Sequence, residues 1–171
     1  QFRSKYDHFS ALRDARLGFL DMSLDEQLTV MKKLGGSPVR HGGVEAVTFL
    51  RPGAKDFLIE CMGIARTCIL TQGMHRFQER VVEALDLPVK DIYGNLSEES
   101  VDYGTSVPKT PAAILVDDMP QKSELVQRKL KAIGLNSDTD RFIEVKGWEG
   151  FGGDKNDYDA VLKKIRTLVK Q

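Results

Sequence analysis

Short apolar runs alternate along this chain with longer stretches in which apolar residues recur at helical spacing. The apolar runs have the length of strands and end at Asp21, Thr71, Asp117 and Val145. Helical spacing is found in residues 23–34, 54–62, 74–85, 121–133 and 157–169. Strands that alternate with helices are typical of a parallel sheet with right-handed crossovers. We therefore predict an α/β fold, a doubly wound parallel sheet of Rossmann type in three layers.

The most informative stretch is the apolar run 112–116, which a proline bounds on each side. A short continuous apolar run between such breakers is typical of a strand buried on both faces. Asp117 and Asp118 follow where this strand must end. Ligands of open α/β sheets bind at the carboxyl ends of strands, and Mg²⁺ prefers carboxylate oxygens, so the pair is a candidate Mg²⁺ site. The alternative is that one aspartate caps the next helix and the other is solvated.

The chain divides into an N-terminal arm and a single domain. Residues 1–16 are polar, with scattered aromatic residues and no clear period, so we expect an arm that packs on a neighbour. Residues 17–171 carry the alternating pattern and are enough for one α/β core. Ser23 and Glu26 have the spacing of a capping box that opens the first helix of this domain. Residues 87–108 have no period and are expected to be irregular.

Composition excludes several kinds of partner and site. Lys+Arg and Asp+Glu are both 25, so the formal net charge is zero, whereas a nucleic-acid interface needs clustered positive charge. No apolar run approaches the roughly 18 residues of a membrane span. Cys61 and Cys68 have neither zinc nor redox spacing, and their apolar surroundings predict buried, reduced thiols. Because the chain opens at Gln1 rather than Met, we expect that it has been processed or trimmed.

Three predicted strand ends carry side chains suited to phosphoryl transfer. Asp21 would be the nucleophile, Thr71 would contact the phosphoryl group through its hydroxyl, and Asp117 with Asp118 would complete a Mg²⁺ site that Asp21 shares. The carboxyl ends of parallel strands lie at one edge of a sheet, so these groups are expected to converge. This edge is the candidate active site.

The motifs around these residues resemble the haloacid-dehalogenase-like superfamily, in its branch of carboxy-terminal-domain phosphatases and NLI-interacting-factor-like proteins. The resemblance extends from Val44 to the end of the chain. Its motifs are Leu50-Arg51-Pro52-Gly53, Asp56-Phe57-Leu58, Ile69-Leu70-Thr71, ILVDDMP at 114–120, Trp148 in a glycine-rich loop, and Asp159 with Leu162. It implies that Thr71 binds phosphoryl oxygens and that Asp117 or Asp118 holds Mg²⁺.

The chain departs from the family pattern at two catalytic positions. Ser23 stands where the family has its general acid, two residues after Asp21. Loss of a general acid costs about 10²–10⁴ in rate. The family's lysine upstream of the acid pair also has no counterpart in residues 101–105. Lys109 or Lys90 could substitute, although each is more simply a surface lysine.

These departures leave three interpretations of function. The first is a degenerate, catalytically inactive domain that binds Mg²⁺ weakly or not at all and acts as a structural or interaction subunit of a larger assembly, with the arm 1–16 and residues 87–108 as candidate contacts to protein subunits. A translocase subunit of the mitochondrial inner membrane carries a similar inactive domain, so the resemblance implies an intracellular, mitochondrial assembly. The second is a Mg²⁺-dependent phosphatase of phosphoproteins, working through a phospho-aspartate at Asp21. The third is a phosphate or nucleotide binder that keeps Thr71 and the acid pair without turnover.

Overall fold

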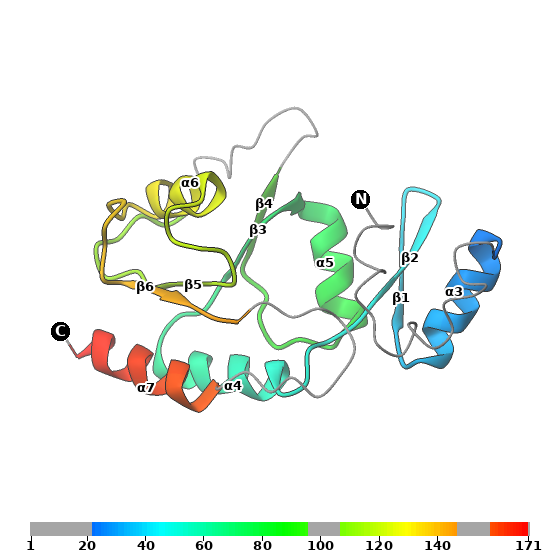
Figure 1. Ribbon diagram of the computed structural model, residues 1–171, viewed down its shortest axis with the longest axis horizontal. Coiled ribbons are helices and arrows are strands. Elements are labelled where there is room, and N and C mark those ends of the chain that lie inside the picture. Colours follow the sequence, from blue (N-terminus) through cyan, green and yellow to red (C-terminus); the bar gives the residue numbers. More distant parts are fainter. Residues whose placement is uncertain (1–21, 96–106, 147–157, 171) are drawn as a thin grey trace.

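The computed structural model describes residues 22–95, 107–146 and 158–170, and these form a mixed α/β structure (Figure 1). The expected strand before Asp21, the arm 1–16 and the loop around Trp148 lie outside the described residues. The described elements are α3 (Leu24–Lys33), β1 (Ser37–His41), β2 (Val44–Thr48), α4 (Ala54–Ile64), β3 (Ile69–Met74), α5 (His75–Ala84), β4 (Ile92–Asn95), β5 (Leu115–Asp117), α6 (Glu124–Ala132), β6 (Phe142–Glu144) and α7 (Tyr158–Val169). Within the described ranges, none of the helices is long and apolar enough to cross a membrane.

The β5–β6 pair has helices on both of its faces. The two strands are parallel, with Leu115 opposite Phe142 and Val116 opposite Ile143. Neighbouring residues of a strand point to opposite faces, so these two cross-strand pairs lie on different sides. One side packs on α6, in a buried cluster of Val107, Leu115, Val126, Leu130, Ile133 and Phe142. The other packs on α4 and α7, in a cluster of Cys61, Ile143, Val161, Leu162, Ile165 and Leu168 with Val116 against it.

Figure 1 shows the same three layers, with β5 and β6 between α6 on one side and α4 with α7 on the other. The prediction that the strand before Asp117 is buried on both faces is therefore confirmed. The sequence also predicts that Gly134 ends the helix over one face, and in the structure Gly134 follows α6 with φ +86°. Glycine is favoured in this left-handed conformation at the end of a helix.

The strands that end at Asp21, Thr71 and Asp117 were predicted to be parallel neighbours, but within the described residues β3, which contains Thr71, does not pair with β5, which ends at Asp117. Here the strands form three separate two-stranded pairs, and the hydrogen-bonded neighbour of β3 is β4. The segment 87–108 was predicted to be irregular, yet it contributes β4, which runs parallel to β3. The two pairs still share packing, because Leu70 of β3 and Tyr93 of β4 lie against the cluster that contains Leu115.

An antiparallel hairpin precedes these parallel pairs and was only half predicted. The sequence predicts an extended segment from Val44 to Leu50, and this segment contains β2, but its partner β1 was not predicted. The turn between them consists of Gly42 and Gly43, with φ of +57° and +79°. Positive φ at both central residues characterises the two-residue turn that suits a twisted hairpin. The hairpin packs on α3 through a small core centred on Met31 and Val47.

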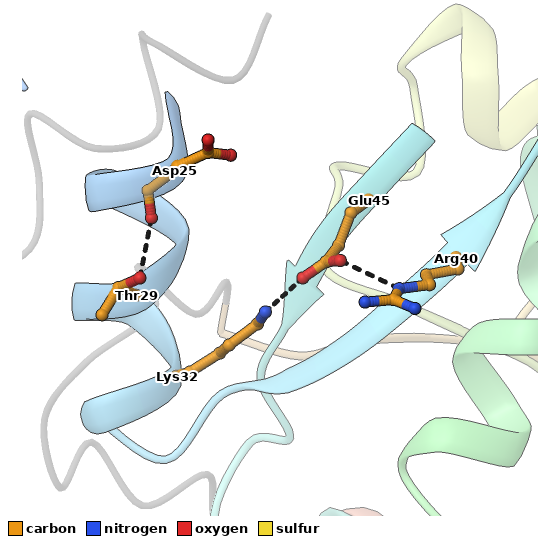
Figure 2. A network of polar contacts seen from close by, with 5 residues as sticks. All are labelled: Asp25, Thr29, Lys32, Arg40 and Glu45. Atoms are coloured by element: carbon orange, nitrogen blue, oxygen red, sulfur yellow. Dashed lines mark hydrogen bonds and ion pairs between the residues drawn. The ribbon is translucent and has the colours of Figure 1, made fainter. Parts of the chain in front are cut away.

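A charge network fixes α3 to this hairpin (Figure 2). Lys32 of α3 forms an ion pair with Glu45 of β2, and the Nε of Arg40 on β1 donates to the same carboxylate at 2.9 Å. The hydrogen bonds from Lys32 and then Arg40 lower the pKa of Glu45. Within α3 the hydroxyl of Thr29 donates to the carbonyl oxygen of Asp25 at 2.8 Å. Glu45 therefore links all three elements at the edge of the small core of Met31 and Val47.

Candidate functional site

Asp117, the last residue of β5, is buried and has both carboxylate oxygens engaged by the protein. Its Oδ2 lies 2.5 Å from the Nζ of Lys129, which comes from α6. Its Oδ1 accepts a hydrogen bond of 3.0 Å from the backbone N–H of Met119. The side chains of Asp117 and Lys129 are only 7% and 13% exposed. This is a buried ion pair, and it is a different arrangement from the open carboxylate that the sequence predicted.

Helix α6 explains how a lysine comes to lie at this position. The helix begins after Ser123, whose hydroxyl accepts a hydrogen bond from the N–H of Val126 at 3.3 Å. Val126 and Leu130 are both 0% exposed and pack on the β5–β6 pair. Lys129 is three residues after Val126, so it lies on the same side of the helix. The apolar part of a lysine can pack on a core while its ammonium group reaches a polar partner.

Lys129 is a residue of the site that the sequence analysis missed. The signal was present, because a lysine occurs between Val126 and Ile133 within the apolar stripe of a predicted helix. A charge at such a position is expected to need a partner. The partner, Asp117, is twelve residues earlier in the chain. The two lysines named from the sequence, Lys90 and Lys109, both precede the acid pair in the chain.

Lys109 and Lys90 are exposed, as expected of surface lysines. A Cβ atom added at Gly134 would lie 3.2 Å from the Cβ of Lys109, which places this lysine beside the end of α6. The next residue, Thr110, donates its backbone N–H to the carbonyl oxygen of Ile133. The cation that neutralises Asp117 among the described residues is therefore Lys129.

The two acids predicted to share a Mg²⁺ ion are split between core and solvent. Asp117 is buried, whereas Asp118 is exposed. Among the residues that the structure describes, no three side chains of His, Cys, Asp or Glu are grouped closely enough to hold a metal ion. Mg²⁺ needs several well-placed oxygens, and a carboxylate already bound to an ammonium group is a poor ligand. The described residues therefore do not fit Mg²⁺. The third predicted ligand, Asp21, lies outside them.

The sequence predicted that Thr71 lies at the end of its strand, but in the structure the strand continues beyond it. β3 continues to Met74, with an irregularity in its pairing between Leu70 and Met74. The hydroxyl of Thr71 accepts a hydrogen bond of 3.1 Å from the backbone N–H of Gly73. In this part of the chain, the polar contact of Thr71 is thus a local one that stabilises the irregular strand.

Ser23, at the position of the missing general acid, has a complete structural role. Its hydroxyl donates to Glu26 Oε2 at 2.7 Å, and the same carboxylate accepts the backbone N–H of Ser23 at 2.8 Å. The N–H of Glu26 points back to the Ser23 hydroxyl at 3.4 Å. The predicted capping box at the start of α3 is therefore confirmed.

The cysteines agree with the sequence analysis at one position and not at the other. Cys61 is buried against α7, and this burial raises the pKa of its thiol. The prediction that Cys68 is also buried is wrong, because its side chain is exposed. Cys68 belongs to the apolar run of the sequence, but it directly precedes β3 and lies outside the core.

Comparisons with protein-family models, with curated proteins and with solved structures find no match to this chain.

Proposed function

We propose that this chain is a degenerate haloacid-dehalogenase-like domain that does not hydrolyse phosphoesters and that serves as a structural or interaction subunit of a larger assembly. One observation carries the proposal. Asp117, the predicted metal ligand at the end of the central strand, is closed off by Lys129 and by the N–H of Met119. The proposal includes the doubly wound sheet, of which the β5–β6 pair with its two helical layers would be one part.

The chemistry of phosphoryl transfer supports this conclusion. Transfer to an aspartate needs a divalent cation that neutralises the charge on the moving group. At Asp117 the single positive charge of the Lys129 side chain forms an ion pair with the carboxylate instead. Ser23, which stands in the position of the general acid, is bound into a helix cap. Two positions that a phosphatase would use are thus committed to the fold.

The function of such a domain would lie in its surface contacts. We propose protein subunits as the partners, with the arm 1–16 and residues 87–108 as the contact segments. The balance of 25 basic and 25 acidic residues supports a protein partner over nucleic acid. By analogy with the inactive domain of a mitochondrial translocase subunit, we place the assembly in the mitochondrion.

Hydrolysis of an aryl phosphate in MgCl₂ tests the absence of catalysis. An activated ester needs little protonation of its leaving group, so the serine at the acid position is not a handicap. We expect no turnover above that of the Asp21→Asn variant, with or without Ser23→Asp. Mg²⁺-dependent turnover by the unmodified chain that disappears in Asp21→Asn would establish a working phosphatase.

Removal of residues 1–16 tests the role as a subunit. We expect the full chain to migrate in a native extract well above the 19.1 kDa of one copy, and the truncated chain to migrate near that mass. Both forms should give the same circular dichroism spectrum and the same unfolding midpoint. A full chain that migrates as a single copy in its native extract would contradict the proposed role.

A further inference from the structure

Helix α4 keeps two large apolar side chains exposed on its outer side. Its inner side packs in the cluster shared with α7, through Phe57, Cys61 and Ile64. Ile59 and Met62, by contrast, are 51% and 45% exposed. Residues three apart in a helix lie on the same face, so these two side chains are neighbours. Figure 1 shows α4 and α7 as the outer layer on this side of the β5–β6 pair.

An ion pair lies near each end of α4. Lys55, in the first turn and four residues before Ile59, forms an ion pair with Asp86. Arg66, two residues after the end of the helix, forms another with Asp91 at 2.9 Å. Each pair has a net charge of zero. The outer side of α4 therefore has an apolar centre between two neutralised charge pairs.

This arrangement suits a second copy of the same chain better than an acidic partner. An acidic segment would find both cations already paired with carboxylates of this chain. Positions 59 and 62 have the same midpoint in the sequence as positions 55 and 66. In an antiparallel contact of two α4 helices, the pair at one end therefore lies opposite the pair at the other end. Two neutral ion pairs can align with unlike charges opposed, whereas two unpaired cations would repel each other.

We propose that two copies of this chain associate through the outer side of α4, with the two helices antiparallel about a two-fold axis between Ile59 and Met62. Ile59 of each copy then lies opposite Met62 of the other, as a self-complementary interface requires. A contact between two single helices is smaller than the roughly 800 Å² per partner of a standard interface, so the dimer is weak. The proposal goes beyond the proposed function, because the dimer does not depend on catalysis or on the arm 1–16.

Sedimentation equilibrium of the full chain, from micromolar to near-millimolar concentration, tests the association. We expect the mean mass to rise from one copy toward two. Ile59→Glu and Met62→Glu should each weaken association at least about tenfold, because a charge then lies in the apolar centre of the contact. Leu24→Glu is the matched control on α3, since Leu24 is 68% exposed, and it should leave association unchanged.

Oxidative crosslinking tests the two-fold geometry, in a Cys68→Ser background that removes the exposed native thiol. At 1.5 Å per residue, the two copies of residue 62 would be displaced along the helix axes by about 4.5 Å, and those of residue 55 by about 16.5 Å. Met62→Cys should therefore form disulfide-linked dimers readily. Lys55→Cys should not, although it lies on the same face of the helix.

A chain that sediments as one copy at every concentration would overturn the proposal. So would equal losses of association in Ile59→Glu and Leu24→Glu, or equal crosslinking at residues 55 and 62. Removal of residues 1–16 should leave the sedimentation result unchanged. A weak dimer dissociates at the low concentration of a native extract, so migration there tests the proposed subunit role separately.

Discussion

Replacement of Lys129 by methionine should lower the free energy of unfolding by about 3–5 kcal/mol, the usual cost of breaking a buried ion pair. Methionine is close to lysine in length, so the apolar stem remains in place and the charge alone is lost. Asp117 would then keep its hydrogen bond from Met119 but would have no counter-charge in a site that is 7% exposed. Urea unfolding in metal-free buffer measures the effect.

Two control variants test whether the loss of stability comes from leaving Asp117 without a counter-charge or from removing any basic side chain. Lys129→Met combined with Asp117→Leu should recover most of the lost stability, since an apolar pair can replace a buried ion pair at little cost. Arg80→Met removes the exposed pair of Arg80 with Glu83, whose side chains are 59% and 65% exposed. That change should cost less than about 1 kcal/mol. Equal, small effects at Lys129 and Arg80 would show that the pair at Asp117 is solvated.

Truncation of Leu130 to alanine should have the next largest effect, a loss of about 2–5 kcal/mol. Leu130 is 0% exposed and packs in the cluster that joins α6 to the β5–β6 pair. The change removes buried methyl groups and leaves a cavity in a region that packed strands and helix prevent from collapsing. Urea unfolding of the variant measures this loss.

Leu24→Ala is the matched control for Leu130→Ala. Leu24 is also a helical leucine, at the first position of α3, but it is 68% exposed, so its truncation should change stability by no more than about 0.5 kcal/mol. Similar losses from the two substitutions would contradict the position of the core between α6 and β5.

Local sequence chemistry predicted the helices and the central strand. Ser23 with Glu26 placed the start of α3, and Gly134 placed the end of α6, because caps depend on residues that are close in the chain. The apolar run before Asp117 predicted a strand covered on both faces, since nothing polar interrupts it. These features needed no knowledge of which elements lie side by side.

The missed strands depend on contacts that are distant in the sequence. β4 contains Gly94 and Asn95, which are typical of turns. Gly94 is suited to its place because a Cβ atom there would lie 2.7 Å from the carbonyl oxygen of Gly73 on β3. β1 contains Pro38, which is disfavoured inside a sheet but tolerated at an edge. Strand pairing is decided by such neighbours more than by the strand's own residues.

The position of the candidate site could be predicted from the sequence, but the ion pair that its carboxylate forms could not. The sequence placed an acid at the carboxyl end of β5, and the structure has Asp117 there. Its partner comes from the next helix, and only the packing of α6 on β5 brings Lys129 within 2.5 Å. Because of this packing, Asp117, which was predicted to be a metal ligand, forms an ion pair with Lys129 instead.

A calorimetric titration of the unmodified chain with MgCl₂ tests most directly whether Asp117 serves the fold or a metal. Because Lys129 and the N–H of Met119 hold both carboxylate oxygens, we predict no saturable binding of Mg²⁺. Tight one-to-one binding that Asp117→Asn abolishes would contradict this account.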